Sequence, residues 1–315
     1  MKSIVMAMVL CCFSIGGFAQ KNSGVDTPRT AKVYFTKDIS PEGLMRLYKA
    51  MGVKVKGKNV AVKLSTGEPG GHNFLNPQLI EPLVKKVKGT IVECNTAYGG
   101  KRRSTESHYK VAEEHGFTAI AKVDIMDGEG EEVIPVKVGK HLQGKNYVGK
   151  NLLNYDYCLV LSHFKGHEMG GFGGALKNIS IGIASSPGKS WIHSSGQMRG
   201  AKQEDFIESM GEAANAVIQH FGGKMLFVNV ANNLSVDCDC SSHPAAPQMG
   251  DIGIFASLDA VAVDKACVDA VYNSEDPGKV HLIERMESRK GPHILEYTEG
   301  LGGGQTEYEL INIDK

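Results

Sequence analysis

Short apolar runs alternate with amphipathic segments along most of this chain. Because strands and helices alternate, we expect an α/β fold with a mostly parallel or mixed sheet, flanked by helices in a Rossmann-like three-layer arrangement. The apolar runs, rich in β-branched or aromatic residues, predict buried strands at Lys32–Phe35, Asn59–Leu64, Thr90–Cys94, Val123–Met126, Tyr157–Leu161, Met225–Val230 and Ile252–Ala256. An N-cap residue, Ser40 or Asn76, followed by proline predicts helices at Pro41–Met51 and Pro77–Val87. The helical spacing of apolar residues predicts helices at Thr105–Glu114 and Glu204–Phe221.

Two segments interrupt this alternation. Residues 128–149 begin and end with glycine and contain Val133–Val138, a pattern that predicts a hairpin-like excursion. Residues 185–202 are predicted to be a polar loop carrying Trp191 and His193. Since no clear linker divides the rest, we expect one domain over residues 31–315, preceded by a polar linker at residues 21–30.

The first twenty residues are typical of a secretory signal peptide. Lys2 supplies the positive end, Ile4–Ile15 is almost wholly apolar, and Gly17 and Ala19 are the small residues that precede cleavage near Ala19–Gln20. No later segment approaches 18 continuous apolar residues. We therefore expect a secreted or periplasmic protein, without a stable membrane span in the mature chain.

Charge and cysteine content limit the function further. Lys+Arg and Asp+Glu are both 35, so there is no net positive field to hold nucleic acid. Removal of the signal peptide leaves five cysteines, and an odd number cannot form a complete set of disulfides. Cys158 and Cys267 lie in apolar runs, which favours small core residues.

Residues 161–178 gather histidines, lysines, a carboxylate and glycines directly after a predicted strand. His163 and His167 have the four-residue spacing of metal ligands, although a hydrogen-bonded polar cluster is an equal alternative. The glycine-rich run before Ala175 resembles an anion-binding nest that opens a helix, although a plain turn is again an equal alternative. Lys177 follows it, either as a point charge for phosphate or carboxylate or as an amine whose pKa is lowered by burial.

A second cluster lies at residues 237–243. Cys238, Cys240 and His243 can hold a soft or borderline cation, and the neighbouring aspartates add oxygen ligands. Two alternatives to a metal site are a reduced pair of thiols at the surface and disulfides to distant cysteines. Together they have the same weight as the metal site. The candidate metal ligands are His163, His167, Cys238, Cys240 and His243.

Polar, glycine-rich loops also follow two other predicted strands, at residues 63–72 and 94–108. Because the carboxyl ends of parallel strands share one edge of a sheet, we expect a ligand crevice there. The candidate anion-binding residues are Lys63, Arg102, Arg103, Gly171, Gly173, Gly174 and Asn178. The candidate catalytic residues are Lys177, Glu168 and His167.

At these residues the chain resembles the DUF362 family, whose members are often labelled iron–sulfur cluster proteins. The resemblance runs through Lys63 with Gly67–Glu68, Tyr98–His108 with Gly116–Phe117, His163–His167 to Lys177–Asn178, Cys238–Cys240 with Asp251–Gly253, Asp259–Lys265, and Ile294–Ile313. Many relatives carry a ferredoxin-like insert after the segment equivalent to Gly188–His193. This chain continues through Ser194–Arg199 without a cysteine, so we do not expect a 4Fe-4S cluster.

The leading hypothesis is an exported metal- and anion-binding protein, and possible roles include a metal-dependent enzyme acting on a small anionic substrate. The expected cofactor is a divalent transition metal, zinc or iron, acting as a Lewis acid or activating water. One alternative is a binding module without turnover. Another is a thiol redox protein that uses Cys238 and Cys240.

Overall fold

The computed structural model describes residues 30–197 and 200–314. The predicted signal peptide, residues 1–20, lies outside the described residues. An eight-stranded sheet crosses the molecule in the order β12-β1-β11-β10-β7-β2-β3-β4, and β11 runs antiparallel to both of its neighbours while the other adjacent strands pair in parallel. The strands of this sheet are β1 (Ala31–Thr36), β2 (Val60–Lys63), β3 (Thr90–Glu93), β4 (Val123–Ile125), β7 (Tyr157–His163), β10 (Met225–Ala231), β11 (Gly253–Ser257) and β12 (Tyr308–Asn312).

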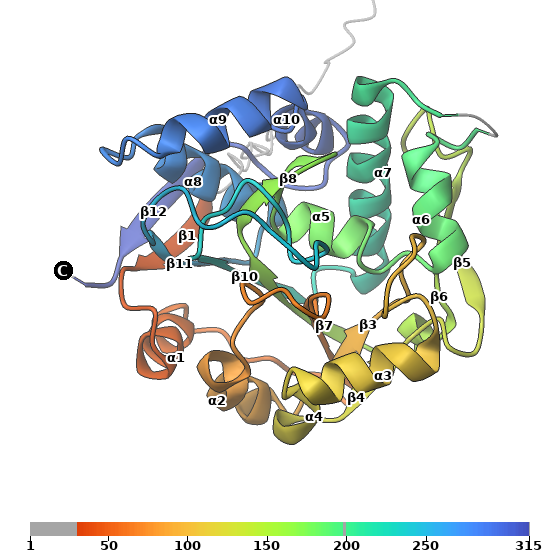
Figure 1. Ribbon diagram of the computed structural model, residues 1–315, viewed down its shortest axis with the longest axis horizontal. Coiled ribbons are helices and arrows are strands. Elements are labelled where there is room, and N and C mark those ends of the chain that lie inside the picture. Colours follow the sequence, from red (N-terminus) through yellow and green to blue (C-terminus); the bar gives the residue numbers. More distant parts are fainter. Residues whose placement is uncertain (1–29, 198–199, 315) are drawn as a thin grey trace, which may run out of the picture.

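Helices cover both faces of the sheet, as Figure 1 shows. One face carries α1 (Pro41–Ala50), α2 (Pro77–Val87), α3 (Thr105–Glu114) and α4 (Phe117–Ile120). The other side carries α5 (Ala175–Ser180), α6 (Ser186–His193), α7 (Gln203–Phe221), α8 (Ala260–Tyr272), α9 (Lys279–Ser288) and α10 (His293–Gly300). The predicted α/β class is therefore confirmed, and each predicted strand and helix is present.

The sheet has a separate apolar core on each face, because side chains alternate between faces along a strand. In β7, Cys158 and Val160 pack into the core beneath α5 and α7, while Leu159 and Leu161 pack into the core beneath α1 and α2. All four side chains are fully buried. Cys94 and Cys267 are buried as well, so the prediction of core positions for Cys158 and Cys267 is confirmed.

The predictions for the two segments that interrupt the alternation, residues 128–149 and 185–202, differ in accuracy. Strands β5 (Glu131–Pro135) and β6 (Lys145–Gly149) pair antiparallel, so the predicted hairpin is confirmed. The short helix η1 (Lys150–Asn154) follows them. The predicted loop at residues 185–202 is wrong for its first half, because Ser185 accepts a hydrogen bond from the Gly188 amide and caps α6.

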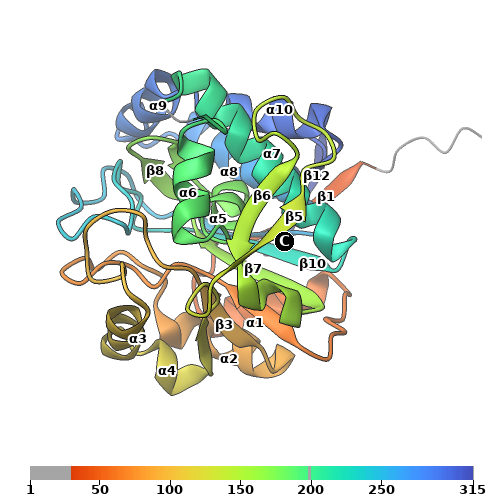
Figure 2. The ribbon, with the colours of Figure 1, turned by 90° about the vertical axis from the view of Figure 1, so that its right-hand side faces the viewer.

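Strand direction places the chemistry-bearing segments together. Strands β2, β3, β7 and β10 are parallel, so the segments that follow them leave the sheet at one edge. Figure 2 shows these loops projecting to the same side of the molecule. The hairpin of β8 (Lys165–His167) and β9 (Gly171–Gly173) follows β7 at this edge. In the described residues, no helix combines the length and apolar character needed to cross a membrane.

Candidate functional site

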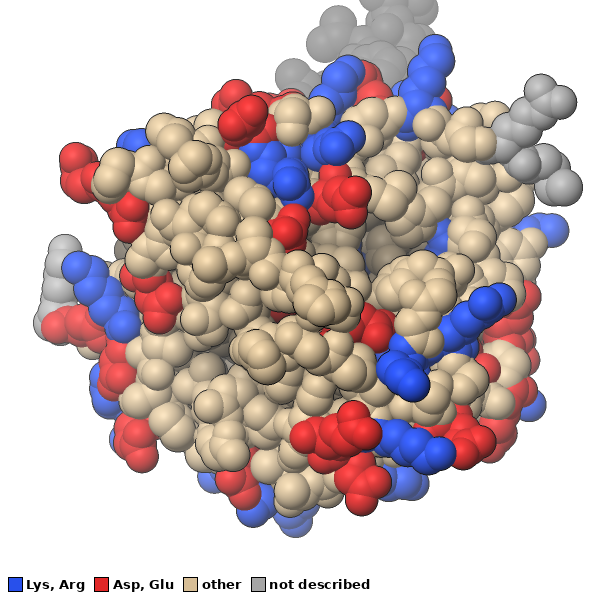
Figure 3. Space-filling view, in the orientation of Figure 1, with Lys and Arg blue, Asp and Glu red and all other residues tan. Residues whose placement is uncertain are grey.

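A cleft of about 990 Å³ opens at the carboxyl edge of the strands. Its lining comes from the segments that follow β2, β3, β7 and β10, together with residues of α5, α6 and α9. The face that carries these loops is visibly hollowed in Figure 3. The crevice expected from the sequence is therefore where the parallel strands end.

Asp239 fixes the segment that follows β10 against the end of β7. Its carboxylate accepts hydrogen bonds from His163 Nδ1 at 2.9 Å and from Lys165 Nζ at 2.7 Å. Burial alone would raise the pKa of Asp239, but the neighbouring His163 and Lys165 outweigh it and hold this pKa well below its usual range. The other ring nitrogen of His163, Nε2, lies 2.6 Å from the Asn232 carbonyl oxygen. This arrangement leaves neither nitrogen of His163 open to a metal ion.

His167 is held in one tautomer. Its Nδ1 atom accepts hydrogen bonds from the backbone amides of Met169, at 3.2 Å, and Gly170, at 2.9 Å. A neutral imidazole that accepts at Nδ1 carries its hydrogen on Nε2. Burial, reinforced by Lys177 and Lys165, holds the pKa of His167 well below its usual range, so the ring is neutral.

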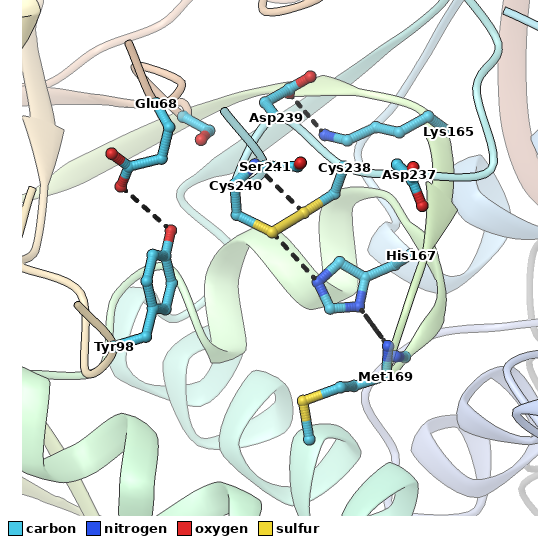
Figure 4. Close-up of a disulfide and its surroundings, with 12 residues drawn as sticks. Glu68, Tyr98, Lys165, His167, Met169, Asp237, Cys238, Asp239, Cys240 and Ser241 are labelled. Carbon is cyan, nitrogen blue, oxygen red and sulfur yellow. Dashed lines mark hydrogen bonds and ion pairs between the residues drawn. A yellow bond between two sulfur atoms is a disulfide. The ribbon is translucent and has the colours of Figure 1, made fainter. Parts of the chain in front are cut away.

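Cys238 and Cys240 form a disulfide beside His167, as Figure 4 shows. The Nε2 atom of His167 lies 3.9 Å from Cys240 Sγ. The candidate ligand atoms of His167, Cys238 and Cys240 all lie within 4.8 Å of one another, which makes them a candidate metal-binding group. His243 is exposed, and its Nδ1 atom lies 3.0 Å from the Ser242 hydroxyl. Of the five predicted ligands, the structure therefore groups three.

The wall formed by the ends of β2 and β3 is ion-paired. Lys63 Nζ donates to Glu93 at 2.8 Å and to the Asn178 side-chain oxygen at 2.9 Å, and it also contacts the Leu64 carbonyl. Arg102 donates to Glu68 at 3.0 Å and to Glu93 at 3.3 Å. All four charged side chains are buried. We refer to Lys63, Glu93, Arg102 and Glu68 as the paired wall.

This pairing corrects part of the predicted anion site. Burial alone would raise the pKa of Glu93, but the charges of Lys63 and Arg102 outweigh it and lower that pKa to about 2. Lys63 and Arg102 therefore neutralise carboxylates of the chain itself and are not free for a ligand. Arg103 is exposed and is not part of the cleft lining.

The predicted anion nest before α5 is occupied by a side chain from α8. The amides of Ala175 and Leu176 donate to the Asp264 carboxylate at 2.7 and 2.9 Å, which satisfies the first amides of the helix. Gly173 and Gly174 line the cleft beside them. Gly171 is not part of the lining; its φ of 78° and the close approach of Gly291 require glycine there.

Lys177, which is half-buried, stands apart from the buried cations of the cleft. Its side chain lines the cleft, and no group in residues 30–197 or 200–314 accepts a hydrogen bond or ion pair from its Nζ atom. Burial, with the charge of Lys165 nearby, lowers the pKa of Lys177 to about 7. The amine therefore exchanges protons near neutral pH. We refer to Lys177, Lys165, His167 and the disulfide as the open wall.

Comparison with known proteins gives the family of the chain. The model for a domain of unknown function, DUF362, matches residues 60–269. The chain belongs to the DUF362 family. No curated protein matches this DUF362 chain.

Two solved structures are similar to the DUF362 chain. One is the lactate racemase apoprotein of Thermoanaerobacterium thermosaccharolyticum, with 19% identity, a TM-score of 0.40, and coverage of 64% of this chain and 50% of that chain. The other is a Thermotoga maritima protein, with 16% identity, a TM-score of 0.42, and coverage of 74% of this chain and 58% of that chain. The DUF362 chain thus spans about half the length of the racemase.

Positive charge predominates in the cleft of this DUF362 protein. The basic lining residues are Lys63, Lys101, Arg102, Lys165, Lys177, Lys189, Arg285 and Arg289. The acidic lining residues are Glu68, Glu93, Glu168, Asp237 and Asp239. Because the acidic side chains are fewer and several are already paired, the cleft favours an anionic occupant over a cationic one.

Several residues that shape the DUF362 site were not predicted. Lys165 lies within the histidine motif, and its position was the available signal. Asp239 was predicted as an oxygen ligand of a metal, but it binds His163 and Lys165 instead. Asp264 lies in α8, within the apolar run that contains Cys267, where a buried carboxylate has no local explanation. Glu168, a predicted catalytic residue, lines the cleft but is exposed.

Proposed function

We propose that this DUF362 protein is exported and binds a small molecule bearing a carboxylate or phosphate, on which Lys177 acts as a base. The observation that carries the proposal is the Lys177 amine, which lines the cleft without a partner among the described residues. The signal-peptide pattern of residues 1–20 supports export.

The open wall suits such a ligand for electrostatic reasons. Lys165 is ion-paired with Asp239 and lies close enough to Lys177 to lower the pKa of that amine. An anion near both amines would offset the repulsion between them. The cleft, at about 990 Å³, is large enough for a metabolite-sized molecule.

The proposed chemistry follows from the state of Lys177. A lysine whose pKa lies near 7 is partly unprotonated at neutral pH, so it can accept a proton from a bound substrate and return it. His167 is neutral because of burial and the nearby lysines, so it adds no positive charge to this part of the cleft. Glu168, which is exposed, has no comparable activation.

The test is anion-dependent thermal stabilisation. Inorganic phosphate and acetate should raise the Tm of the wild-type protein above that in chloride of equal ionic strength, since a ligand of the native state stabilises it. Lys177→Met should lose most of this increase, and the exposed Lys122→Met should retain it. An equal increase in both variants would contradict the role of Lys177. Retention of binding without conversion of any carboxylate or phosphate substrate would favour a binding module.

A metal site remains a second candidate, because His167, Cys238 and Cys240 are grouped. The two sulfur atoms are bonded to each other in the disulfide, so this site would form only after reduction. Metal analysis of the untagged, reduced protein tests it. About one equivalent of zinc or iron, lost in Cys238→Ser, would support the site; the same content in both proteins would exclude it.

A further inference from the structure

We propose that the Cys238–Cys240 disulfide is a site of thiol–disulfide exchange for small thiols that carry a carboxylate. Cys240 is the sulfur that forms the mixed disulfide with the external thiol, and Cys238 is the leaving sulfur, released as a thiolate when the disulfide breaks. This activity goes beyond the proposed base chemistry of Lys177 and does not require it.

The disulfide is poorly suited to a purely structural role. It joins residues only two apart in sequence, and so short a loop restricts the unfolded chain little. The segment is held in place by other contacts. Asp239 binds His163 and Lys165, and its carbonyl accepts a hydrogen bond of 2.8 Å from the Glu68 amide. These contacts would keep the two sulfur atoms at the cleft after reduction.

The accessibility of the five described cysteines confines exchange to this pair. Both sulfur-bearing residues line the cleft, and Cys240 is half-buried whereas Cys238 is only 6% exposed. Cys94, Cys158 and Cys267 are buried in the cores, where burial raises the pKa of each thiol. An external thiol therefore meets Cys240 first.

Each sulfur atom has its own N–H donor. The Cys240 amide donates to Cys238 Sγ at 3.2 Å, and His167 Nε2 faces Cys240 Sγ at 3.9 Å. The tautomer of His167 is set by the two amides that donate to its Nδ1 atom, so its Nε2 hydrogen points toward sulfur (Figure 4). Such donors stabilise a thiolate as it forms.

The exchange balances with two molecules of an external thiol. A first thiolate attacks Cys240 Sγ, the disulfide bond breaks, and its electron pair goes to Cys238 Sγ beside the Cys240 amide. A second thiolate attacks the external sulfur of the mixed disulfide, releasing an external disulfide and the Cys240 thiolate. The protein disulfide is reduced, the external thiol is oxidised, and the protons of the two thiols pass through water to the protein sulfurs.

The charge of the cleft selects the thiol. Arg289 and Lys177 line the same cleft as the disulfide, and so does Arg285, which pairs with Asp237 at 3.4 Å. A thiol with a carboxylate is attracted to these cations, whereas a thiol with an ammonium group is repelled. Mercaptoacetate, 2-mercaptoethanol and cysteamine are matched in size and differ in charge, so they serve as probes.

The first experiment measures reduction of the native wild-type protein by these three thiols, with iodoacetamide trapping and rates corrected for thiolate concentration and thiol pKa. We expect alkylation of Cys238 and Cys240 alone, with mercaptoacetate at least tenfold faster than 2-mercaptoethanol and cysteamine slowest. Absence of alkylation before unfolding, or three equal rates, would overturn the proposal. This test needs no variant, so misfolding cannot explain its outcome.

The second experiment assigns the two sulfurs and the donor. Cys238→Ser should form a mixed disulfide with 5,5′-dithiobis(2-nitrobenzoate) at least tenfold faster than Cys240→Ser, because the remaining sulfur is the more exposed one. His167→Asn should slow reduction of the disulfide severalfold, and His243→Asn, an exposed histidine nearby, should not. Equal rates within either pair would refute the assigned roles.

The two proposals can fail separately. Both are measured on the wild-type protein by independent readouts: phosphate binding by the Tm of the unreduced protein, and exchange by iodoacetamide trapping without phosphate. Loss of exchange in the wild-type protein would contradict the disulfide proposal alone, and loss of phosphate stabilisation there would contradict the anion proposal alone.

Discussion

The paired wall and the open wall both contain ion-paired lysines, since Lys165 pairs with Asp239 as Lys63 pairs with Glu93, and the two walls differ at Lys177. Lys63 and Arg102 each contact buried carboxylates, whereas Lys177 contacts none among the described residues. The sequence places Lys63 at the end of a strand and Lys177 after a glycine-rich run, and both are predicted to lie at the same edge of the sheet. The contacts of Lys63 and Lys177 show that a carboxylate partner, and not a position at the sheet edge, distinguishes a structural lysine from a reactive one.

The energetic consequences of the two walls are opposite. Buried opposite charges stabilise one another's ionised forms, so removal of one partner leaves an uncompensated buried charge. A buried amine without a partner is costly when charged, and its pKa falls. The paired wall should therefore control stability, and the open wall should control reactivity.

The largest expected effect comes from breaking the paired wall. Glu93→Gln leaves Lys63 and Arg102 without one of their carboxylates and should lower the free energy of unfolding by about 3–5 kcal/mol, measured by urea denaturation. Glu168→Gln, at an exposed position in the same cleft, should change it by less than about 0.5 kcal/mol. Equal losses in the two variants would show that the paired wall has no special structural role.

Acid should weaken the paired wall in a defined pH range. The pKa of Glu93 is about 2 in the folded protein, against roughly 4.3 in an unfolded chain. Its stabilising contribution is therefore complete above about pH 4.3 and is lost as the pH falls toward 2. The wild-type protein should lose more stability than Glu93→Gln over this range in urea titrations. Parallel pH profiles would contradict the pairing.

A smaller effect of opposite sign is expected from the open wall. The folded-state pKa of Lys177 is about 7, below its unfolded value, so the cost of charging the amine is present below pH 7 and fades as the pH rises toward 10. Lys177→Met should therefore stabilise the protein on the order of 1 kcal/mol at pH 6 and less at pH 9. Lys122→Met should show no such trend. A stabilisation that grows with pH would contradict the low pKa.

The smallest effect is expected at Arg103, which lies outside the cleft lining. Arg103→Met should leave both phosphate stabilisation and the free energy of unfolding within about 0.5 kcal/mol of wild type. A clear loss of phosphate stabilisation would extend the anion site beyond the two walls.

Local signals explain which parts of the molecule were predictable from sequence. Helix α3 has its predicted bounds because Ser104 caps it and its apolar residues recur at helical spacing. The strand-end loops were predicted to converge because parallel strands share an edge. The contacts of Asp264 with α5, and of Lys63 with Glu93, join residues 89, 88 and 30 positions apart, and sequence spacing does not determine which partners meet.

The site was predictable in location but not in chemistry. The motif around Lys177 and the Cys238–Cys240 pair both lie at the cleft. Their states depend on three-dimensional surroundings: His163 binds Asp239, His167 accepts two amides, and the two cysteines bond to each other. Each of these contacts occupies an atom that was predicted to bind a metal ion.

The most direct test of the account is competitive acetylation of lysines across pH 5–11, with and without inorganic phosphate, read out residue by residue by mass spectrometry. Lys177 should react with a midpoint near pH 7, and phosphate should slow its reaction while leaving Lys122 unaffected. A midpoint for Lys177 equal to that of Lys122, with no protection by phosphate, would contradict the claim that the open wall holds a reactive, anion-binding amine.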